Sequence, residues 1–335
     1  LASPREQGYA RGMADFDAII IGGGHNGLVC AAYLAMGGLK VKLFEKRAVV
    51  GGAAVTEEFH PGFRNSVAAY TVSLLNPKVI ADLRLHEHGL RVVERRAQNF
   101  LPDPDGRYLL TGEDRTRESL ARLGARDIAR LDGFTAEIEA IADVLRALVL
   151  RPPPNVVEGL GLDALRAALD ALGLANLLRG LSLGRRRMLL DLMTMSAGDM
   201  LDDRFETDLI KALYGFDAIV GNYASPYTPG TAYVMLHHAF GEVNGRKGVW
   251  GHALGGMGAI TQAMAGAAKA QGAAIEAGVG VREVILDKGR ARGVVLDDGR
   301  AISAEAVVSG INPKLLYTRL VAPDALPDAF RERIG

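Results

Sequence analysis

A glycine-rich turn near the start of the chain joins a short apolar run to an apolar helical pattern. The run 18–21 ends in glycine, and Gly22, Gly24 and Gly27 fit the spacing G-x-G-x-x-G. In this spacing the first glycine makes a tight turn, the second lets the backbone approach a pyrophosphate, and the third lets the helix pack close to the strand. The N–H groups at the helix N-terminus would then face the phosphates. The spacing therefore predicts a dinucleotide site.

An acidic residue follows at the distance that such a site requires. A second predicted strand, residues 40–44, ends in Glu45, roughly twenty residues beyond the glycines, where a carboxylate would meet a ribose hydroxyl. A glycine-rich loop in another strand–helix unit is the alternative, but the order strand, loop, helix, strand and acid favours the dinucleotide site. His25 and Asn26 fill the variable loop positions, where they serve either loop geometry and helix capping or a hydrogen bond near the cofactor.

Composition narrows the classes of function. The 335 residues suffice for one large domain or two ordinary ones, and the formal net charge of +0 shows no electrostatic footprint for nucleic acid. The single cysteine, Cys30, rules out a dithiol mechanism within the chain. No run approaches the roughly 18 apolar residues of a membrane span, and no metal-ligand spacing is present. Residues 1–13 are interpreted as a leader or read-through sequence, and the predicted compartment is the cytoplasm, or the mitochondrion in a eukaryote.

Further along, the patterns predict a second, mainly helical region. Gly51, Gly52 and Ala53 indicate backbone lying against a ligand, and residues 56–70, which are polar and broken by proline and glycine, predict an extended loop. Asp105-Gly106 between two apolar runs is a hairpin signal. Apolar spacing predicts helices over 115–123, 125–150, 163–178 and 185–195.

The last third of the chain returns to strand patterns. After a helix over 259–270, short strands at 281–286, 291–296 and 301–303 predict a meander, and a separate buried strand at 304–309 predicts a return to the first sheet. We therefore expect an α/β protein. Residues 14–75 and 245–335 would form a discontinuous Rossmann-like domain, and residues 76–244 an inserted α+β, mainly helical substrate domain.

Two leucine-rich stretches, 146–151 and 179–187, carry arginines beside apolar residues. This pattern is found in helices that lie on a membrane surface. It is also found in ordinary helices that pack one side on a core. Peripheral membrane contact is therefore one of two interpretations of these stretches.

Several motifs of the sequence resemble those of the phytoene desaturase-related FAD oxidoreductases. DAIIIGGGHNGLVCAAYLAMGG and LFEKRAVVGGAAVTEEFHPGF are similar to the N-terminal FAD signature of that family. GGGHNGL, SLLNP, SPYTPGTAYVMLHH, GGMGAITQAMAGAAKAQGAAI and AVVSGINPK most resemble its pyridine nucleotide-disulfide oxidoreductase domain-containing protein 2 branch. The resemblance is strong over residues 15–90 and 225–320 and weak through the central helices.

The resemblance implies FAD bound in an extended form, with a further C-terminal segment beyond Gly335 in relatives. The glycine loop would take the pyrophosphate, Glu45 the adenosine ribose, residues 51–53 the phosphate and ribityl part, and the backbone of Val281 the adenine. The implied cofactor-binding set is Gly22, Gly24, His25, Asn26, Gly27, Glu45, Lys46, Gly51, Gly52, Ala53, Val281, Ser309 and Gly310.

The implied activity is hydride transfer between flavin N5 and a carbon–carbon bond of an apolar, polyene-like or lipid-like substrate, with oxygen or a quinone as electron acceptor. The branch name suggests a disulfide reductase, but the chain has neither C-x-x-C nor a second dinucleotide fingerprint. No catalytic acid or base stands out, although His60, Tyr70 and Tyr233 lie in segments that could reach a pocket. Two other functions are open: a nucleotide-binding regulator or assembly protein without turnover, and an NAD-dependent dehydrogenase.

Overall fold

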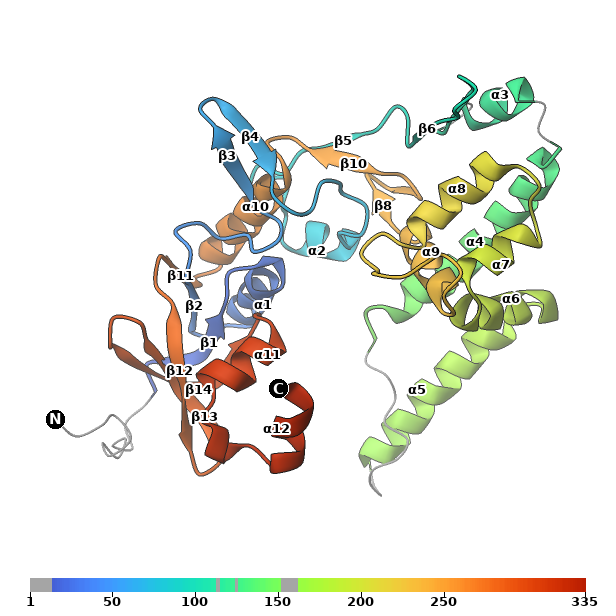
Figure 1. Cartoon of the computed structure of the whole chain (residues 1–335). Coiled ribbons are helices and arrows are strands. Elements are labelled where there is room, and N and C mark those ends of the chain that lie inside the picture. Colours follow the sequence, from blue (N-terminus) through green and yellow to red (C-terminus); the bar gives the residue numbers. More distant parts are fainter. Residues whose placement is uncertain (1–13, 113–114, 124–125, 152–161) are drawn as a thin grey trace. The chain divides into compact units, whose positions relative to one another are not determined.

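The computed structural model describes residues 14–112, 115–123, 126–151 and 162–335 (Figure 1). These residues form two compact units. The first unit holds the described residues up to Val72 together with 77–93 and 252–335, and the second unit holds 73–76 and 94–251. Residues 77–93 thus lie in the first unit, whereas the division expected from the sequence places them in the inserted domain. Residues 73–75 and 245–251 lie in the second unit, whereas that division places them in the Rossmann-like domain. The expected leader, residues 1–13, lies outside the described residues.

A six-stranded mixed sheet is the centre of the first unit. Its order is β11-β2-β1-β14-β13-β12, with β11, β2, β1 and β14 parallel and β14, β13 and β12 antiparallel. The strands are β1 (Phe16–Ile21), β2 (Val41–Glu45), β11 (Ala274–Ala277), β12 (Val281–Asp287), β13 (Arg290–Leu296) and β14 (Ala301–Ser309). The predicted meander and the predicted return to the first sheet are both confirmed, and so is the α/β class.

One detail of this region was predicted wrongly. Residues 301–303 and 304–309 do not form two strands, because no turn separates them. The single strand β14 pairs with β13 through its first residues and with β1 through Ala304 and the residues after it. One long strand therefore joins the antiparallel meander to the parallel part of the sheet.

Two helices with alanine-rich buried faces contact each other in the first unit. They are α1 (His25–Met36) and α10 (Met257–Ala270). α1 buries Leu28, Ala31 and Ala32, while the buried side chains of α10 include Ala263 and Ala267. Small side chains let the two helices approach closely. In β1, next to α1, residues 18–21 are an unbroken apolar run because this part of the strand is buried on both faces.

The loop expected at 56–70 is instead largely a β-hairpin. β3 (Thr56–His60) and β4 (Phe63–Ser66) pair antiparallel around Pro61 and Gly62, where Gly62 has a positive φ of 80°. The hairpin is a two-stranded ribbon whose side chains are mostly exposed. It therefore lacks the alternation of apolar and polar residues that identifies a half-buried strand.

The remaining elements of the first unit lie mostly at its C-terminal end. Asn312 caps the short helix Pro313–Leu315 there, since its Oδ1 accepts a 2.8 Å hydrogen bond from the Lys314 N–H. A two-stranded sheet of β5 and β10 lies where the chain crosses between units. These elements are α2 (Pro77–Asp82), β5 (Val92–Glu94), β10 (Gly251–Ala253), α11 (Pro313–Leu315), the π-helical turn η1 (Leu316–Leu320), the 3-10 turn η2 (Pro323–Ala325) and α12 (Asp328–Ile334).

The second unit is mainly helical, as predicted. Its elements are α3 (Arg115–Arg122), α4 (Ile128–Leu148), α5 (Leu162–Arg179), α6 (Leu183–Thr194), α7 (Ala197–Asp202), α8 (Asp208–Asp217), α9 (Thr231–Ala239), and the hairpins of β6 (Phe100–Pro102) with β7 (Tyr108–Leu110) and β8 (Glu242–Val243) with β9 (Arg246–Lys247). The hairpin predicted at Asp105-Gly106 is the one between β6 and β7. The core includes three aromatic rings, with Phe134 lying edge-on to Phe205 and Tyr214.

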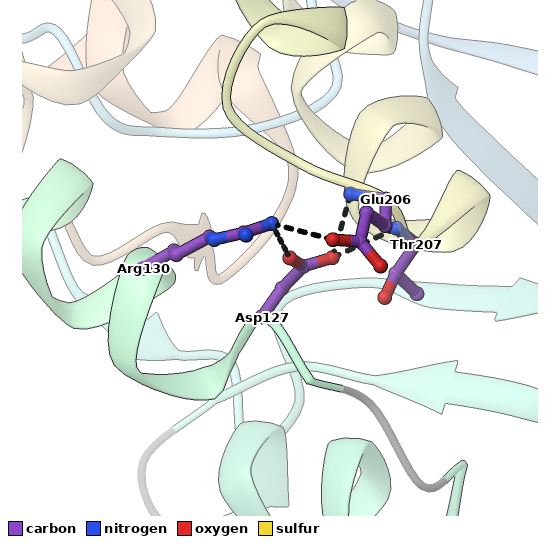
Figure 2. A network of polar contacts seen from close by, with 4 residues as sticks. All are labelled: Asp127, Arg130, Glu206 and Thr207. Carbon is purple, nitrogen blue, oxygen red and sulfur yellow. Dashed lines mark hydrogen bonds and ion pairs between the residues drawn. The ribbon is translucent and has the colours of Figure 1, made fainter.

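A buried carboxylate fastens the start of α8 to the start of α4 (Figure 2). Asp127 is fully buried, and its Oδ2 accepts hydrogen bonds from the N–H groups of Glu206 (2.9 Å) and Thr207 (2.8 Å). Arg130 donates to Oδ1 of Asp127 at 3.0 Å and also contacts Glu206. Burial alone would raise the pKa of Asp127, but these donors outweigh burial and hold the pKa below its usual value.

No helix among the described residues combines the length and the apolar character that crossing a membrane requires.

Candidate functional site

Two glycines of the predicted loop are required by the fold itself. Gly22 has a φ of +98°, and a Cβ there would lie 2.8 Å from Cγ2 of Ile311. A Cβ on Gly27 would lie 2.1 Å from the carbonyl oxygen of Gly22, so any side chain would push α1 away from the turn. These geometries match the tight-turn and close-packing roles that the spacing predicts.

Gly24 differs from both. Its φ of −68° and ψ of 169° are open to any residue, and a Cβ there would meet nothing nearer than the Gly52 Cα at 3.9 Å. The fold therefore does not require glycine at position 24. The space beside this Cα is open at the N-terminus of α1, where a ligand could approach the backbone.

The N-terminus of α1 suits an anionic group. No side chain caps the helix, and its first turn contains no acidic residue. His25 and Asn26, the variable residues of the loop, have exposed side chains. Since a helix N-terminus carries partial positive charge and N–H donors, this end of α1 favours a phosphate.

Glu45 lies at the end of β2, beside this loop, and is 9% exposed. Its Oε2 accepts a 2.7 Å hydrogen bond from the N–H of Gly23, and its Oε1 accepts one of 2.9 Å from the N–H of Arg47. Each carboxylate oxygen can accept a second hydrogen bond. The carboxylate therefore holds the glycine loop and retains acceptor capacity for a ligand hydroxyl.

The second glycine pair lies against the first glycine loop. The N–H of Gly51 donates to the carbonyl of Gly23 at 2.8 Å, and Gly24 and Gly51 form an isolated parallel bridge. Gly52 has a φ of +57° and lies close to Gly24, because a Cβ on Gly52 would lie 3.0 Å from the Cα of Gly24. Ala53, next in the chain, is exposed. Residues far apart in the sequence thus form one glycine-lined cradle.

The support beneath this cradle was missed by the sequence reasoning. The hydroxyl of Thr261 on α10 donates to the carbonyl of Ala54 at 2.9 Å, while the Gly258 N–H donates to the hydroxyl of Thr56 at 2.9 Å. A Cβ on Gly258 would lie 2.8 Å from the Thr56 backbone nitrogen. The glycines at 255, 256 and 258, just before an apolar helix, were the signal that could have indicated this close packing.

The segment before β12 lies beside the end of β2. The N–H groups of Gly278 and Val279 donate to the carbonyls of Arg47 and Glu45, at 2.8 and 3.0 Å. Val281, the first residue of β12, follows this segment and is half-buried. Lys46 is exposed and lies 3.8 Å from Asp297, so its side chain is engaged at the surface.

Ser309 and Gly310, at the end of β14, complete the neighbourhood. The Gly310 N–H donates to the carbonyl of Ile21 at 2.8 Å, and a Cβ on Gly310 would lie 3.5 Å from the backbone of Gly27. The hydroxyl of Ser309 is buried without a hydrogen-bond partner among the described residues. Such a hydroxyl could serve a polar group bound at this end of the sheet.

A cavity of about 580 Å³ lies next to the cradle within the first unit. The hydroxyl of Ser66 on its wall accepts a 3.0 Å hydrogen bond from the Met257 N–H, at the start of α10. Tyr70, one of the candidate pocket residues, also lines it. The full lining is Thr56, Arg64, Asn65, Ser66, Tyr70, His252, Ala253, Gly255, Gly256 and Met257.

The other residues that the sequence offered as pocket candidates do not line this cavity. His60 is at the exposed hairpin, edge-on to Phe63, and Tyr233 lies on α9 of the second unit. Half-burial raises the pKa of the Cys30 thiol, which disfavours a reactive thiolate. Among the described residues, no group of three His, Cys, Asp or Glu side chains could hold a metal ion.

Fold and cradle together define a class. Parallel strands end in a glycine loop, a helix N-terminus faces it, and a carboxylate ends the adjacent strand. This is the architecture of a Rossmann-like dinucleotide-binding unit. A model of the family described as flavin containing amine oxidoreductase matches residues 27–335, and the chain belongs to this family. The family is FAD-dependent, which confirms the predicted cofactor at the level of the family.

Known relatives agree with the predicted resemblance. The chain is 37% identical over 347 residues to the mouse pyridine nucleotide-disulfide oxidoreductase domain-containing protein 2, covering 99% of this chain and 59% of the mouse protein. It is 27% identical over 325 residues to the zeta-carotene-forming phytoene desaturase of Myxococcus xanthus, covering 94% and 57% of the two chains. The chain thus spans somewhat more than half the length of these relatives.

Solved structures support the fold alone. An oxidoreductase from Methanosarcina mazei is 17% identical, with a TM-score of 0.56 and coverage of 95% of this chain and 64% of the other. Putrescine oxidase bound to putrescine is 20% identical, with a TM-score of 0.56 and coverage of 95% and 63%. At such identities the similarity defines the architecture, and the substrates of these proteins do not carry over.

Proposed function

We propose that the first unit binds FAD along the glycine-lined cradle and that the chain is part of an FAD-dependent oxidoreductase. The observation that carries the proposal is Gly24, the glycine for which the fold has no need. The N-terminus of α1 would hold the pyrophosphate, Glu45 the ribose hydroxyls, and residues 51–53 the phosphate and ribityl part. Lys46 and Val281 would flank the adenosine end, with Ser309 and Gly310 beside the glycine loop.

We expect Gly24→Val and Glu45→Ala each to reduce FAD retention. The first places a side chain where the pyrophosphate would lie, and the second removes the acceptor for the ribose. The measurement is the flavin absorbance of the purified chain after incubation with FAD and desalting. Gly133→Val is the matched control, because position 133 is exposed on α4 of the second unit and a Cβ there meets nothing within 4 Å.

Unchanged FAD retention in both variants would refute the site. Loss of FAD in Gly133→Val as well would show that the effect is a general loss of folding. Far-UV circular dichroism distinguishes loss of FAD binding from loss of folding. We expect the spectrum of Gly24→Val to match that of the wild type, because valine can adopt the φ and ψ angles of position 24.

The proposed reaction is dehydrogenation or saturation of a carbon–carbon bond in an apolar substrate. In the first direction one C–H bond would give a hydride to the flavin N5 while the neighbouring carbon loses a proton to solvent, and the second direction is the reverse. The names of two relatives, the phytoene desaturase and a limonene dehydrogenase chain from Castellaniella defragrans, favour polyene or terpene-like substrates. The proposed electron acceptor is oxygen or a quinone, and the proposed compartment is the cytoplasm. Residues of this chain would contribute binding, orientation and exclusion of water around the cofactor.

Anaerobic bleaching of bound flavin on addition of a polyene or an acyl lipid tests this reaction. FAD retained without bleaching by any such compound would favour a nucleotide-binding regulator on the same scaffold. The name of the mouse relative suggests disulfide chemistry, but the single cysteine of this chain argues against a dithiol mechanism within it.

A further inference from the structure

The cavity of about 580 Å³ next to the cradle has a wall of one charge. Two of its lining side chains, Arg64 and His252, are basic, and none of the described residues that line it is Asp or Glu. A cavity of about 540 Å³ in the second unit is different, since Asp103, Glu206 and Asp208 line it together with two arginines. The cavity of the first unit therefore favours a ligand that carries negative charge.

The guanidinium of Arg64 on β4 is the main charge of this wall. Arg64 is exposed, and its side chain makes no hydrogen bond or ion pair with the residues that the structure describes. Glu58 lies opposite it in the hairpin but outside the lining of the cavity, and its Oε1 accepts a 2.9 Å hydrogen bond from the N–H of Gly62. The other acid of the hairpin, Glu57, is paired with Arg47. The five N–H donors of Arg64 are thus available to a ligand.

Three polar side chains beside Arg64 have their acceptor oxygens engaged within the fold. Oδ1 of Asn65 accepts a 2.9 Å hydrogen bond from the N–H of Ser66, which leaves the side-chain NH2 of Asn65 as a donor. The hydroxyl of Ser66 accepts from the N–H of Met257 at 3.0 Å. The hydroxyl of Thr56 accepts from the N–H of Gly258 at 2.9 Å. Within the described part of the chain these three side chains donate to no acceptor, so they suit a ligand rich in acceptor oxygens.

The N-terminus of α10 strengthens the two hydroxyl donors. β3 of the hairpin contacts this helix of 14 residues, which lies beside the hairpin in Figure 1. The first turn of α10 contains no acidic residue, and its first two N–H groups are the ones that donate to Ser66 and Thr56. A hydroxyl that accepts from the positive end of a helix is polarised and becomes a stronger donor to the next group.

We propose that this cavity binds the carboxylate or phosphate end of an amphiphilic molecule whose chain is apolar. Arg64 and Asn65 would donate to the anionic oxygens, and the hydroxyls of Thr56 and Ser66 would donate to the oxygens that remain. A volume of about 580 Å³ is typical of pockets for whole small molecules, so the cavity has room for the beginning of the chain as well. That this molecule is the substrate rests on the proposed function, and the substrate is then a polyene or acyl acid or phosphate rather than a hydrocarbon.

Binding of a fluorescent polyene acid tests this inference without turnover. The probe is cis-parinaric acid, a conjugated fatty acid whose fluorescence rises when its chain enters a protein, and its methyl ester has the same chain without the charge. We expect the full chain to bind the acid about tenfold more tightly than the ester, because the anion adds charge-assisted hydrogen bonds. Decanoate and decyl phosphate should displace the acid, the better of the two identifying the preferred anion, whereas decanol should not.

Two variants separate the anion site from a general affinity for fatty acids. Arg64→Gln should weaken binding of the acid about tenfold and leave binding of the ester unchanged. Arg282→Gln is the matched control, because it removes the same charge from an exposed arginine on β12, outside the cavity, and should bind both probes as the wild type does. Asn65→Asp keeps the acceptor for the N–H of Ser66 but replaces the NH2 donor with a charged oxygen, so it should repel the acid and spare the ester.

Equal wild-type affinities for acid and ester would overturn the proposal, as would equal losses in Arg64→Gln and Arg282→Gln or binding of neither probe. Displacement of the acid by FAD would assign the cavity to the cofactor and would overturn it too. The flavin absorbance of the wild-type chain, measured separately, distinguishes this failure from that of the proposed function. A chain that retains FAD but does not discriminate acid from ester refutes the anion site alone, and one that discriminates but retains no FAD refutes the cofactor site alone.

Discussion

Each unit contains a buried carboxylate that accepts hydrogen bonds from two backbone N–H groups. The two carboxylates differ in how many further hydrogen bonds they can accept. Glu45 in the first unit accepts one bond on each oxygen, from Gly23 and Arg47. Asp127 in the second unit accepts two bonds on Oδ2 and one from Arg130 on Oδ1. The first has a free acceptor position on each oxygen, whereas the second is close to saturated and carries a guanidinium partner.

The difference separates a carboxylate suited to a ligand from one that serves the fold. Glu45 ends a parallel strand beside a glycine loop and an uncapped helix N-terminus, so a ligand hydroxyl can reach it. Asp127 is enclosed between the starts of α4 and α8, and its donors come from the protein alone (Figure 2). Burial and hydrogen bonding are therefore insufficient to identify a functional acid, and its unused acceptor capacity is the better criterion.

The comparison predicts a large loss of stability when Asp127 is removed. In Asp127→Ala, the N–H groups of Glu206 and Thr207 lose their acceptor, and the free energy of unfolding should fall by about 2–4 kcal/mol. The only tryptophan, Trp250, lies in the second unit, so denaturation followed by its fluorescence reports on that unit. The control Asp132→Ala breaks an exposed pair with Arg117 and should cost less than about 1 kcal/mol.

Equal losses in Asp127→Ala and its control would show that the network of Figure 2 does not stabilise the second unit. The pH dependence gives a second test. Because the folded-state pKa of Asp127 is lowered, its contribution is present above the unfolded pKa and is lost as the pH falls through the folded value. The stability difference between wild type and Asp127→Ala should therefore shrink in acid, below about pH 4.

A third carboxylate, that of Asp217 at the end of α8, is half-buried and accepts no hydrogen bond from the residues that the structure describes. Burial raises its pKa from 3.8 to about 7. The unfolded chain releases this proton near pH 4, whereas the folded chain holds it up to about pH 7, so stability falls as the pH rises through this window. Asp217→Asn should flatten that slope and, at pH 8, stabilise the chain by roughly 1–3 kcal/mol.

Urea denaturation of wild type and Asp217→Asn at several pH values measures this effect as a difference between two curves. Other titrating groups contribute equally to both proteins and cancel in the difference. Parallel curves across about pH 4 to 8 would contradict the burial of Asp217 as the cause of its raised pKa.

The sequence predicted the first unit better than the second, for physical reasons. Gly22, Gly24, Gly27 and Glu45 follow from local rules, since turn geometry, helix packing and ligand approach each act over a few residues. The strands of the meander follow from apolar alternation and turn residues. The apolar pattern of residues 304–309 indicated the return of this strand to the first sheet, but no pattern indicated the place of β11 beside β2.

The remainder depends on contacts between distant residues. Asp127 is an ordinary N-terminal helix residue by sequence, and only the fold brings Glu206 and Thr207 to it. The hydroxyls of Thr56 and Thr261 support the cradle across about two hundred residues of chain. The β3–β4 hairpin escaped prediction because an exposed ribbon leaves no hydrophobic period. Local patterns thus predicted the cradle, but not what supports it.

The smallest change sharpens the contrast between the two carboxylates. Glu45→Gln keeps one carbonyl oxygen as an acceptor for the N–H of Gly23, but its NH2 group then faces the N–H of Arg47. The free energy of unfolding should therefore fall by about 1–2 kcal/mol, less than in Asp127→Ala. The neutral amide accepts more weakly from a ligand hydroxyl than a carboxylate does, so the FAD dissociation constant should rise about tenfold. Titration with FAD measures the second quantity and denaturation the first. A variant that unfolds as easily as Asp127→Ala but binds FAD unchanged would make Glu45 a second structural carboxylate, and the ribose would then require another partner in the cradle.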